Sequence, residues 1–431
     1  MKQIGTSRTG RTSAVLYQGI EFLLLGLATP FLLFPSREPK ATVAVLALLV
    51  VLWLGSLPWR RPWPVTPFNG ALLLFTVMVG VGSIVTAYPD LTLSKATGFI
   101  LGMGLFRWAA GMRRRTALVL ALAAFLLAAL GVWGLGLMGT AWLSKVSALQ
   151  TLLDRLPEQV VSLPGTPERG INPNQLGGVL ALLLPLPVAL ALMGHFTWRS
   201  LPLRLFLGGL AVAWGGTLLL TQSRSGWMGG AVGLVALAAL WGLSGQQRWQ
   251  RWAGAAFLFL VTMGAGALLT HWGPGRVGEL LASATQGHVD SPVGTITIQG
   301  RLEIWSRALY AILDFPFTGC GLGTFRRTVW VLYPFFSLSP GFDVAHAHNI
   351  FLQTALDLGL PGLVAYLALL GLAGVAGWRV ARRSKETRWL GLGMLAGLVG
   401  LHVYGLTDAL ALGSRPHFLF WWMLGLLAAA L

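Results

Sequence analysis

The chain has 431 residues, of which 55% are hydrophobic and only 10% are charged. Soluble globular proteins carry about 25% charged residues, so this composition excludes a water-soluble domain and indicates an integral membrane protein. The formal net charge is +17, but the basic residues are spread along the chain and form no patch that would indicate a nucleic-acid partner. The single cysteine, Cys320, excludes an internal disulfide.

Apolar stretches long enough to cross a bilayer follow one another along the chain, and we expect about twelve transmembrane helices. The first follows Lys2, Arg8 and Arg11 and resembles a signal peptide, but its length and the lack of a small-residue cleavage site favour a retained helix. Lipid offers backbone amides no partners, so the expected fold is an all-α polytopic bundle forming one integral membrane domain, residues 1–431. The expected spans lie near 14–34, 41–58, 66–87, 92–111, 116–143, 174–194, 205–221, 226–244, 253–270, 348–376, 389–406 and 413–431.

Basic residues are concentrated in alternate connections between these stretches, which predicts that those connections and both termini are cytoplasmic. With this topology the inner side holds 18 basic and 2 acidic residues, whereas the outer side holds 13 basic and 12 acidic residues. The positive net charge is therefore interpreted as a topology signal. The basic connections are Arg60–Arg61, Arg113–Arg115, Arg199 with Arg204, Arg248 with Arg251, and the run from Arg379 to Arg388.

Two of the predicted extracytoplasmic connections are long, namely residues 144–173 and 271–347. Within the second, apolar residues recur at helical spacing over residues 301–313, and Pro316 and Gly319 end the pattern. We expect an amphipathic helix on the membrane surface there.

Four polar clusters lie on the predicted outer side: residues 168–175, 222–226, 300–305, and 345–349 with Asp408 and Arg415 nearby. Each arginine alone would suit an anchor at the membrane interface. Together, Arg169, Arg224 and Arg301 predict an anion site, because the guanidinium fork binds phosphate oxygens and keeps its charge. The neighbouring histidine pair would add an acid–base group.

Two alternatives start from the same residues. His346 and His348 with Asp343 would suit a metal ion, but the acidic cluster of a magnesium or manganese diphosphate site is absent from the sequence. The run from Gly319 to Thr324 lacks the spacing and strand context of a phosphate-binding loop and is interpreted as a turn. The sequence therefore predicts neither a metal nor a cofactor.

These motifs resemble the O-antigen ligase and polymerase family. His348-Asn349 is followed by nine residues, Gly359, two residues and Gly362, which is similar to the ligase motif. The resemblance covers roughly residues 70–431 and includes, in the family's order, Arg169 with Asn172-Pro173-Asn174, the Ser223–Gly226 turn, and Gly300-Arg301 through Trp305 with the glycines up to Phe325.

The resemblance implies a GT-C-like membrane glycosyltransferase that takes a glycan from a polyprenyl (undecaprenyl) diphosphate. It implies that His348 is the essential histidine and that Arg169, Arg224 and Arg301 contact the diphosphate. Other residues of the same clusters are expected to bind substrate: Asn349, His346, Asn172, Asn174, Ser223 and Asp408.

The expected enzyme is a metal-independent, inverting ligase in the bacterial plasma membrane, with its active site facing the extracytoplasmic side. Its partners would be the lipid-linked donor, a glycan, lipid-core or protein acceptor, and membrane lipid, as in lipopolysaccharide assembly. A polymerase of the same family, joining polyprenyl-linked repeat units, is the first alternative. A secondary transporter is the second, although transporters place ionisable residues near the membrane midplane and often have repeated halves.

Overall fold

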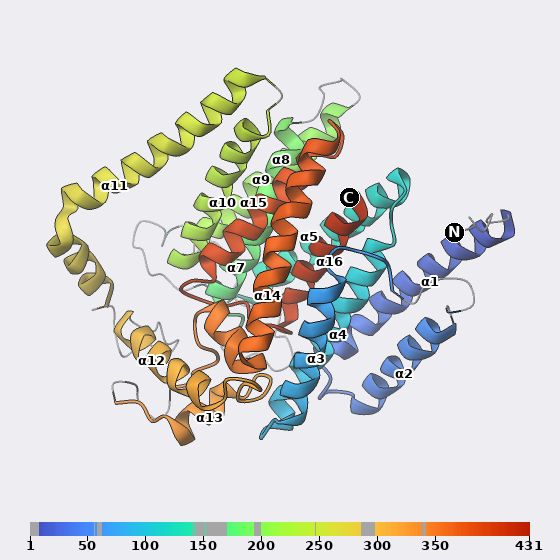
Figure 1. The fold of residues 1–431 in the computed structure, drawn as a ribbon, viewed down its shortest axis with the longest axis horizontal. Coiled ribbons are helices and arrows are strands. Elements are labelled where there is room, and N and C mark those ends of the chain that lie inside the picture. Colours follow the sequence, from blue (N-terminus) through green and yellow to red (C-terminus); the bar gives the residue numbers. More distant parts are fainter. Residues whose placement is uncertain are drawn as a thin grey trace.

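The computed structural model describes residues 8–55, 57, 63–140, 142, 151, 170–193, 200–245, 247–285, 298–336, 338 and 342–431, and in these residues the fold is all-helical (Figure 1). The one β contact among them is an isolated parallel bridge between Thr140 and Ile171. The predicted helical class is therefore confirmed. The helices are α1 (Arg8–Leu33), α2 (Pro39–Gly55), α3 (Asn69–Ile84), α4 (Pro89–Ala110), α5 (Arg115–Gly139), α7 (Pro173–Leu183), α8 (Pro185–Met193), α9 (Leu201–Leu220), α10 (Arg224–Leu243), α11 (Arg248–Thr285), α12 (Ile298–Asp314), α13 (Phe325–Leu332), α14 (Ile350–Arg383), α15 (Arg388–Tyr404), η3 (Arg415–His417) and α16 (Phe418–Ala430).

Every predicted membrane span contains a helix, and α7 and α8 share one span that is interrupted before Pro185. Six helices in the described part of the chain are long and apolar enough to cross a membrane, and α2 and α3 are shorter apolar helices. A polytopic helical membrane protein is therefore supported, whereas the count of about twelve crossings stays a prediction. The six are Leu16–Leu33, Arg115–Gly139, Pro173–Leu192, Leu201–Leu220, Arg224–Leu243 and Ile350–Arg383.

The helices present apolar side chains both inward and outward. Aromatic rings of α3, α4, α14 and α16 meet in the interior. The ring centroids of Phe75 and Trp421 lie 5.3 Å apart, and both side chains are fully buried. On the outside, Leu120 is 71% exposed and Val212 is 76% exposed. Large apolar side chains exposed along whole helices are what lipid contact requires, because lipid tails solvate them as well as a protein interior does.

α4 connects the two ends of the bundle. At its start, the Thr92 hydroxyl donates to the Leu322 carbonyl at 2.8 Å, in the turn between α12 and α13. At its other end, Arg107 pairs with Glu21 of α1. The first half of α1 therefore lies at the end of the bundle opposite α12 and α13.

α14 runs in the same direction as α4. Near its start, Asp357 accepts a hydrogen bond of 2.9 Å from the Gly323 amide, and at its end Arg383 donates to the Leu431 carbonyl. The C-terminus and the start of α1 therefore share one end of the bundle. Figure 1 shows α12 and α13 at the other end, with α11 along one edge and α1 and α2 along the opposite edge.

The long connection 271–347 differs in part from its prediction. α11 continues to Thr285, beyond the predicted end of its span at residue 270. Its 38 residues make a helix of roughly 57 Å, which exceeds the hydrocarbon thickness of about 30 Å. The predicted amphipathic helix is confirmed as α12, which ends at Asp314, before Pro316. The connection 144–173 lies outside the described residues except for Thr151 and the segment from Gly170.

Candidate active site

Two histidines and one carboxylate meet at the start of α14. His348 Nδ1 lies 3.3 Å from Asp408 Oδ1, and His346 Nε2 lies 3.6 Å from the same oxygen. The two imidazole rings have centroids 4.3 Å apart. Asp408 is 2% exposed and His346 is 8% exposed, so the three groups form a largely buried cluster.

The backbone around His348 is held in an unusual conformation. Its φ is +49°, in the left-handed region that residues with a side chain rarely adopt. Next to it, the Asn349 side chain caps α14 by accepting from the amides of Phe351 and Leu352 at 2.9 and 3.0 Å. The side-chain Nδ2 of Asn349 donates to the Leu406 carbonyl at 3.0 Å. The cap therefore joins the His348 segment to the connection that carries Asp408.

The electrostatic environment assigns different protonation states to the cluster. Burial, followed by the charge of His348, lowers the pKa of His346 to about 3, so His346 is neutral near pH 7. Burial alone would raise the pKa of Asp408, but His348, His346 and Arg301 together lower it below its usual range. Asp408 is therefore an ionised acceptor between two imidazoles.

The tautomer of His346 follows from its neighbour. The His348 amide donates to His346 Nδ1 at 3.1 Å, so the proton of a neutral His346 is on Nε2, which faces Asp408. Metal-bound histidines instead donate their second ring nitrogen to an acceptor. His346, His348 and Asp408 have ligand atoms within 4.8 Å of one another, but this tautomer turns an N–H toward the position that a metal would take.

Asp343, the carboxylate expected in the metal alternative, is not part of this cluster. It forms an exposed ion pair with Arg326 at the start of α13. Asp408 occupies the corresponding place beside the histidines. The interpretation that used Asp343 is therefore wrong for the described structure.

Buried polar atoms without a hydrogen-bond partner in the described chain collect around the cluster. Arg301 lies in the first turn of α12, and its charge acts on both His346 and Asp408. Its Nε, Trp305 Nε1 one helical turn later, the Tyr404 hydroxyl and Asp408 Oδ2 all belong to this set. Native proteins pair nearly all buried polar groups, so a polar ligand at this place would supply the partners that these atoms lack.

The first turn of α10 lies next to the same connection. The Ser225 hydroxyl lies 2.8 Å from the hydroxyl of Thr407, the residue before Asp408. Arg224 is exposed at the first position of α10, and Ser223 caps the helix by accepting from the Gly226 amide at 3.1 Å. The structure thus brings the predicted Ser223–Gly226 turn to the histidine cluster.

The start of α7 packs against this turn. A Cβ on Gly177 would lie 2.9 Å from Ser223 Cβ, which shows how closely the two segments approach. Asn172 caps α7 by accepting from the Asn174 amide at 2.9 Å. Three predicted substrate-binding residues, Asn172, Ser223 and Asn349, are therefore helix caps. Arg169 lies outside the described residues.

The three capped helices α7, α10 and α14 all begin in this region. The N-terminal ends of helices carry partial positive charge, which favours anions. Arg224 and Arg301 add two full positive charges. The arrangement is chemically suited to hold an anionic group beside a histidine that faces a carboxylate.

Sequence reasoning missed Gln353 and Asp357, which lie just inside α14. Gln353 is 4% exposed and Asp357 is fully buried. Their spacing of four residues places both on one face of a helix, and polar residues within an otherwise apolar span are typically functional or paired. That pattern was available in the sequence.

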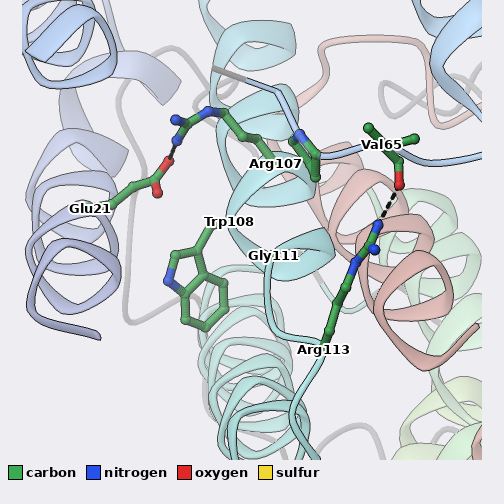
Figure 2. Close-up of a pocket in the computed structure, with 7 residues that line it drawn as sticks. Glu21, Val65, Arg107, Trp108, Gly111 and Arg113 are labelled. Atoms are coloured by element: carbon green, nitrogen blue, oxygen red, sulfur yellow. Dashed lines mark hydrogen bonds and ion pairs between the residues drawn. The ribbon is translucent and has the colours of Figure 1, made fainter. Parts of the chain in front are cut away.

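A polar pocket lies away from the histidine cluster, at the other end of α4 (Figure 2). It has a volume of about 450 Å³ and is lined by Glu21, Pro64, Val65, Arg107, Trp108, Gly111 and Arg113. Its charged groups already have partners, because Arg107 pairs with Glu21 and Arg113 donates to the Val65 carbonyl.

Comparison with known families identifies one match. Residues 209–367 match the family described as O-antigen ligase. A comparison with curated proteins finds no match. The matched segment includes Arg224, Arg301, His346 and His348, and together with the apolar helices it supports a bacterial membrane protein that acts in glycan transfer. This segment of the chain is therefore similar to the O-antigen ligase family, and it includes both histidines of the cluster.

Proposed function

We propose that the protein transfers a glycan from a polyprenyl diphosphate carrier to an acceptor hydroxyl on the extracytoplasmic face of the bacterial plasma membrane. The observation that carries this proposal is the position of His348 against Asp408, with Arg301 close enough for its charge to act on Asp408. A general base and an anion-binding group therefore lie side by side.

The reaction is a direct displacement at the anomeric carbon of the donor sugar. The acceptor oxygen forms a bond to that carbon, while the bond from the carbon to the diphosphate oxygen breaks. The acceptor proton passes to His348, and the diphosphate leaves with the bonding electron pair. Inversion of the anomeric configuration follows from a single displacement.

Asp408 supports the base in this reaction. A carboxylate facing Nδ1 favours the tautomer that carries its proton there, which leaves Nε2 of His348 to accept the proton of the acceptor. The imidazolium that forms is then stabilised by the same carboxylate. A positioned base of this kind contributes a factor of about 10² to 10⁴ to the rate.

Arg224 and Arg301 bind the diphosphate and stabilise its negative charge as the bond breaks. Arg169 is proposed as a third contact. Because diphosphate is a good leaving group, charge stabilisation and positioning supply most of the catalysis, and arginines take the role that a metal ion has in other diphosphate enzymes.

The distribution of basic residues supports an extracytoplasmic site. Arg113–Arg115 follow the end of α4, and Arg388 donates to the Trp241 carbonyl at 2.9 Å, where α10 ends and α15 begins. These connections lie at the end of the bundle opposite His348. The positive-inside rule favours a cytoplasmic position for such connections, which supports the proposed extracytoplasmic position of His348.

The proposed reaction type is ligation to a new acceptor, in keeping with the His348-Asn349 motif and the family match. Polymerisation of polyprenyl-linked repeat units by the same chemistry is the second candidate, because the family resemblance extends to both. Product analysis separates them: a ligase yields a glycan on a different acceptor, and a polymerase yields a longer polyprenyl-linked chain.

The test uses purified protein in lipid nanodiscs with a polyprenyl-diphosphate-linked glycan donor and excess chelator. We expect transfer to continue in chelator, and His348→Ala to lower turnover by about 10² or more. Full turnover of His348→Ala would remove the proposed base. Loss of product in chelator that a divalent ion restores would replace the arginine mechanism with a metal mechanism.

A further inference from the structure

We propose that Gln353 and Asp357 are positioning residues that clasp the His348 segment to the glycine turn of residues 319–323, and so hold the catalytic base in register with α12, the helix that carries Arg301. This inference rests on the proposed role of His348. The two side chains and their hydrogen bonds are called the clasp below.

The clasp is a continuous chain of hydrogen bonds. The Ala347 amide, between His346 and His348, donates to Gln353 Oε1 at 2.8 Å. Gln353 Nε2 donates to Asp357 Oδ1 at 2.8 Å. The same oxygen accepts from the Gly323 amide at 2.9 Å. Two backbone amides from segments far apart in the sequence are thereby connected through two buried side chains.

The clasp is carried by a short helical segment that is separated from the rest of α14. Gly359 interrupts α14 with φ +67° and ψ 178°. A Cβ at Gly359 would lie 2.4 Å from the Phe317 carbonyl oxygen, so the preceding connection packs directly into the break. At the break, the Leu360 amide donates to the Pro316 carbonyl at 2.7 Å. Residues 350–358 therefore form a separate helical unit with His348 at its start.

The glycine turn is shaped to fit this unit. Gly319, Gly321 and Gly323 all have positive φ, which presents their amides at angles that residues with side chains rarely allow. The Cys320 amide donates to the carbonyl of Leu356, the residue before Asp357, at 2.7 Å. The turn follows α12, so a displacement of the turn is transmitted to the helix that carries Arg301.

The clasp acts through His348 and does not contact the reacting atoms. Gln353 and Asp357 are buried, and one oxygen of each accepts from a backbone amide, Gln353 Oε1 from Ala347 and Asp357 Oδ1 from Gly323. His348 has a backbone conformation with φ +49°, which persists only where surrounding contacts enforce it. The hydrogen bond that the amide of Ala347, the residue before His348, donates to Gln353 is one of those contacts.

The test combines enzyme kinetics with hydrogen–deuterium exchange on the full-length protein in nanodiscs. Gln353→Met and Asp357→Leu remove the polar atoms at nearly constant volume, whereas Asp357→Asn keeps an oxygen for both donors. Thr354→Val is the matched control, because Thr354 is a neighbouring buried residue of the same segment whose hydroxyl donates only to its own helix, to the Ile350 carbonyl at 2.7 Å.

We expect Gln353→Met and Asp357→Leu to lower kcat by roughly 10- to 100-fold, because small displacements of a catalytic group have effects of this size, with the donor KM nearly unchanged. Asp357→Asn should keep most of the activity that Asp357→Leu loses, and Thr354→Val should leave kcat unchanged. Exchange in peptides covering residues 344–349 should accelerate in the first two variants only.

Unchanged exchange at residues 344–349 in Gln353→Met would overturn the clasp, whatever the activity. Equal losses of kcat in Thr354→Val and Gln353→Met would show a general packing effect and would also overturn it. Wild-type protein without transferase activity, but with the expected exchange pattern, would remove the proposed function and leave the clasp in place.

Discussion

His348 Nδ1 lies 3.3 Å from Asp408 Oδ1, although His348 precedes α14 and Asp408 follows α15. The contact depends on the adjoining ends of these helices, since the Ile350 amide donates to the Gly405 carbonyl at 2.8 Å. Packing of α14 against α15 therefore determines the orientation of the imidazole. Any change that separates the two helix ends should affect the base before it affects anion binding.

Asp408→Asn is expected to lower kcat by about 10² while the donor KM changes little, because the imidazolium formed in the reaction loses its counter-charge. Steady-state kinetics with the lipid-linked donor would measure this. Asp343→Asn is the matched control, because Asp343 lies five residues before His348 but pairs with Arg326. Equal effects of the two substitutions would contradict the role of Asp408.

Arg224→Gln is expected to lower kcat/KM for the donor by roughly 10- to 100-fold, because a charge-assisted contact to diphosphate is lost. Arg224→Lys should restore only part of the activity, since lysine lacks the planar fork. Arg327→Gln provides the comparison, because Arg327 is an exposed arginine of the same region that pairs with Asp90 at 2.9 Å. A loss in Arg327→Gln as large as in Arg224→Gln would indicate a general charge effect.

Most of the fold was predictable because membrane helices are defined by local composition. Each apolar stretch had to be helical, and the helix of residues 301–313 was indicated by spacing and by Pro316. The end of α11 was not predictable in this way. It continues to Thr285 through Gly273-Pro274-Gly275, residue types that normally end a helix.

The candidate site could be proposed from the sequence as a set of residue types but not as an arrangement. Charge patterning predicts that Arg224, Arg301 and His348 lie on one side of the membrane, and this stays a prediction. It did not show that Asp408 rather than Asp343 faces the histidines, because that choice depends on how α14 and α15 pack. Nor did it show that Asn349 is a cap, since capping and substrate contact use the same residue types.

Gly359→Ala is expected to lower the melting temperature strongly. Its φ of +67° disfavours any side chain, and a Cβ would lie 2.4 Å from the Phe317 oxygen. A cost of about 1 to 3 kcal/mol follows from the backbone conformation alone, and the clash adds to it.

Gly371→Ala in the same helix is the control, because nothing lies within 4 Å of its Cβ position. Alanine there should be neutral or stabilising. Similar losses in both variants would contradict the special role of the break.

The pH dependence of stability should contain a contribution from His346. Burial, together with the facing charges of His348, Lys95 and Arg301, lowers its pKa to about 3, while Asp408 opposes the shift. An unfolded histidine titrates near 6.5, so between these values the unfolded state binds the extra proton. Stability is therefore fully present above about pH 6.5 and falls as the pH decreases, by about 2 kcal/mol at pH 5.

His346→Asn is the variant that isolates this contribution. Its side-chain oxygen can accept from the His348 amide as Nδ1 does, but it does not titrate. Thermal unfolding in detergent should therefore show a smaller decrease between pH 7 and pH 5 for the variant than for the wild type. Asp408 does not obscure the comparison, because its lowered pKa places its titration below this range. Identical decreases in the two proteins would mean that His346 is already protonated in the folded state at pH 5, and the cluster would then contain an ion pair instead of a neutral imidazole.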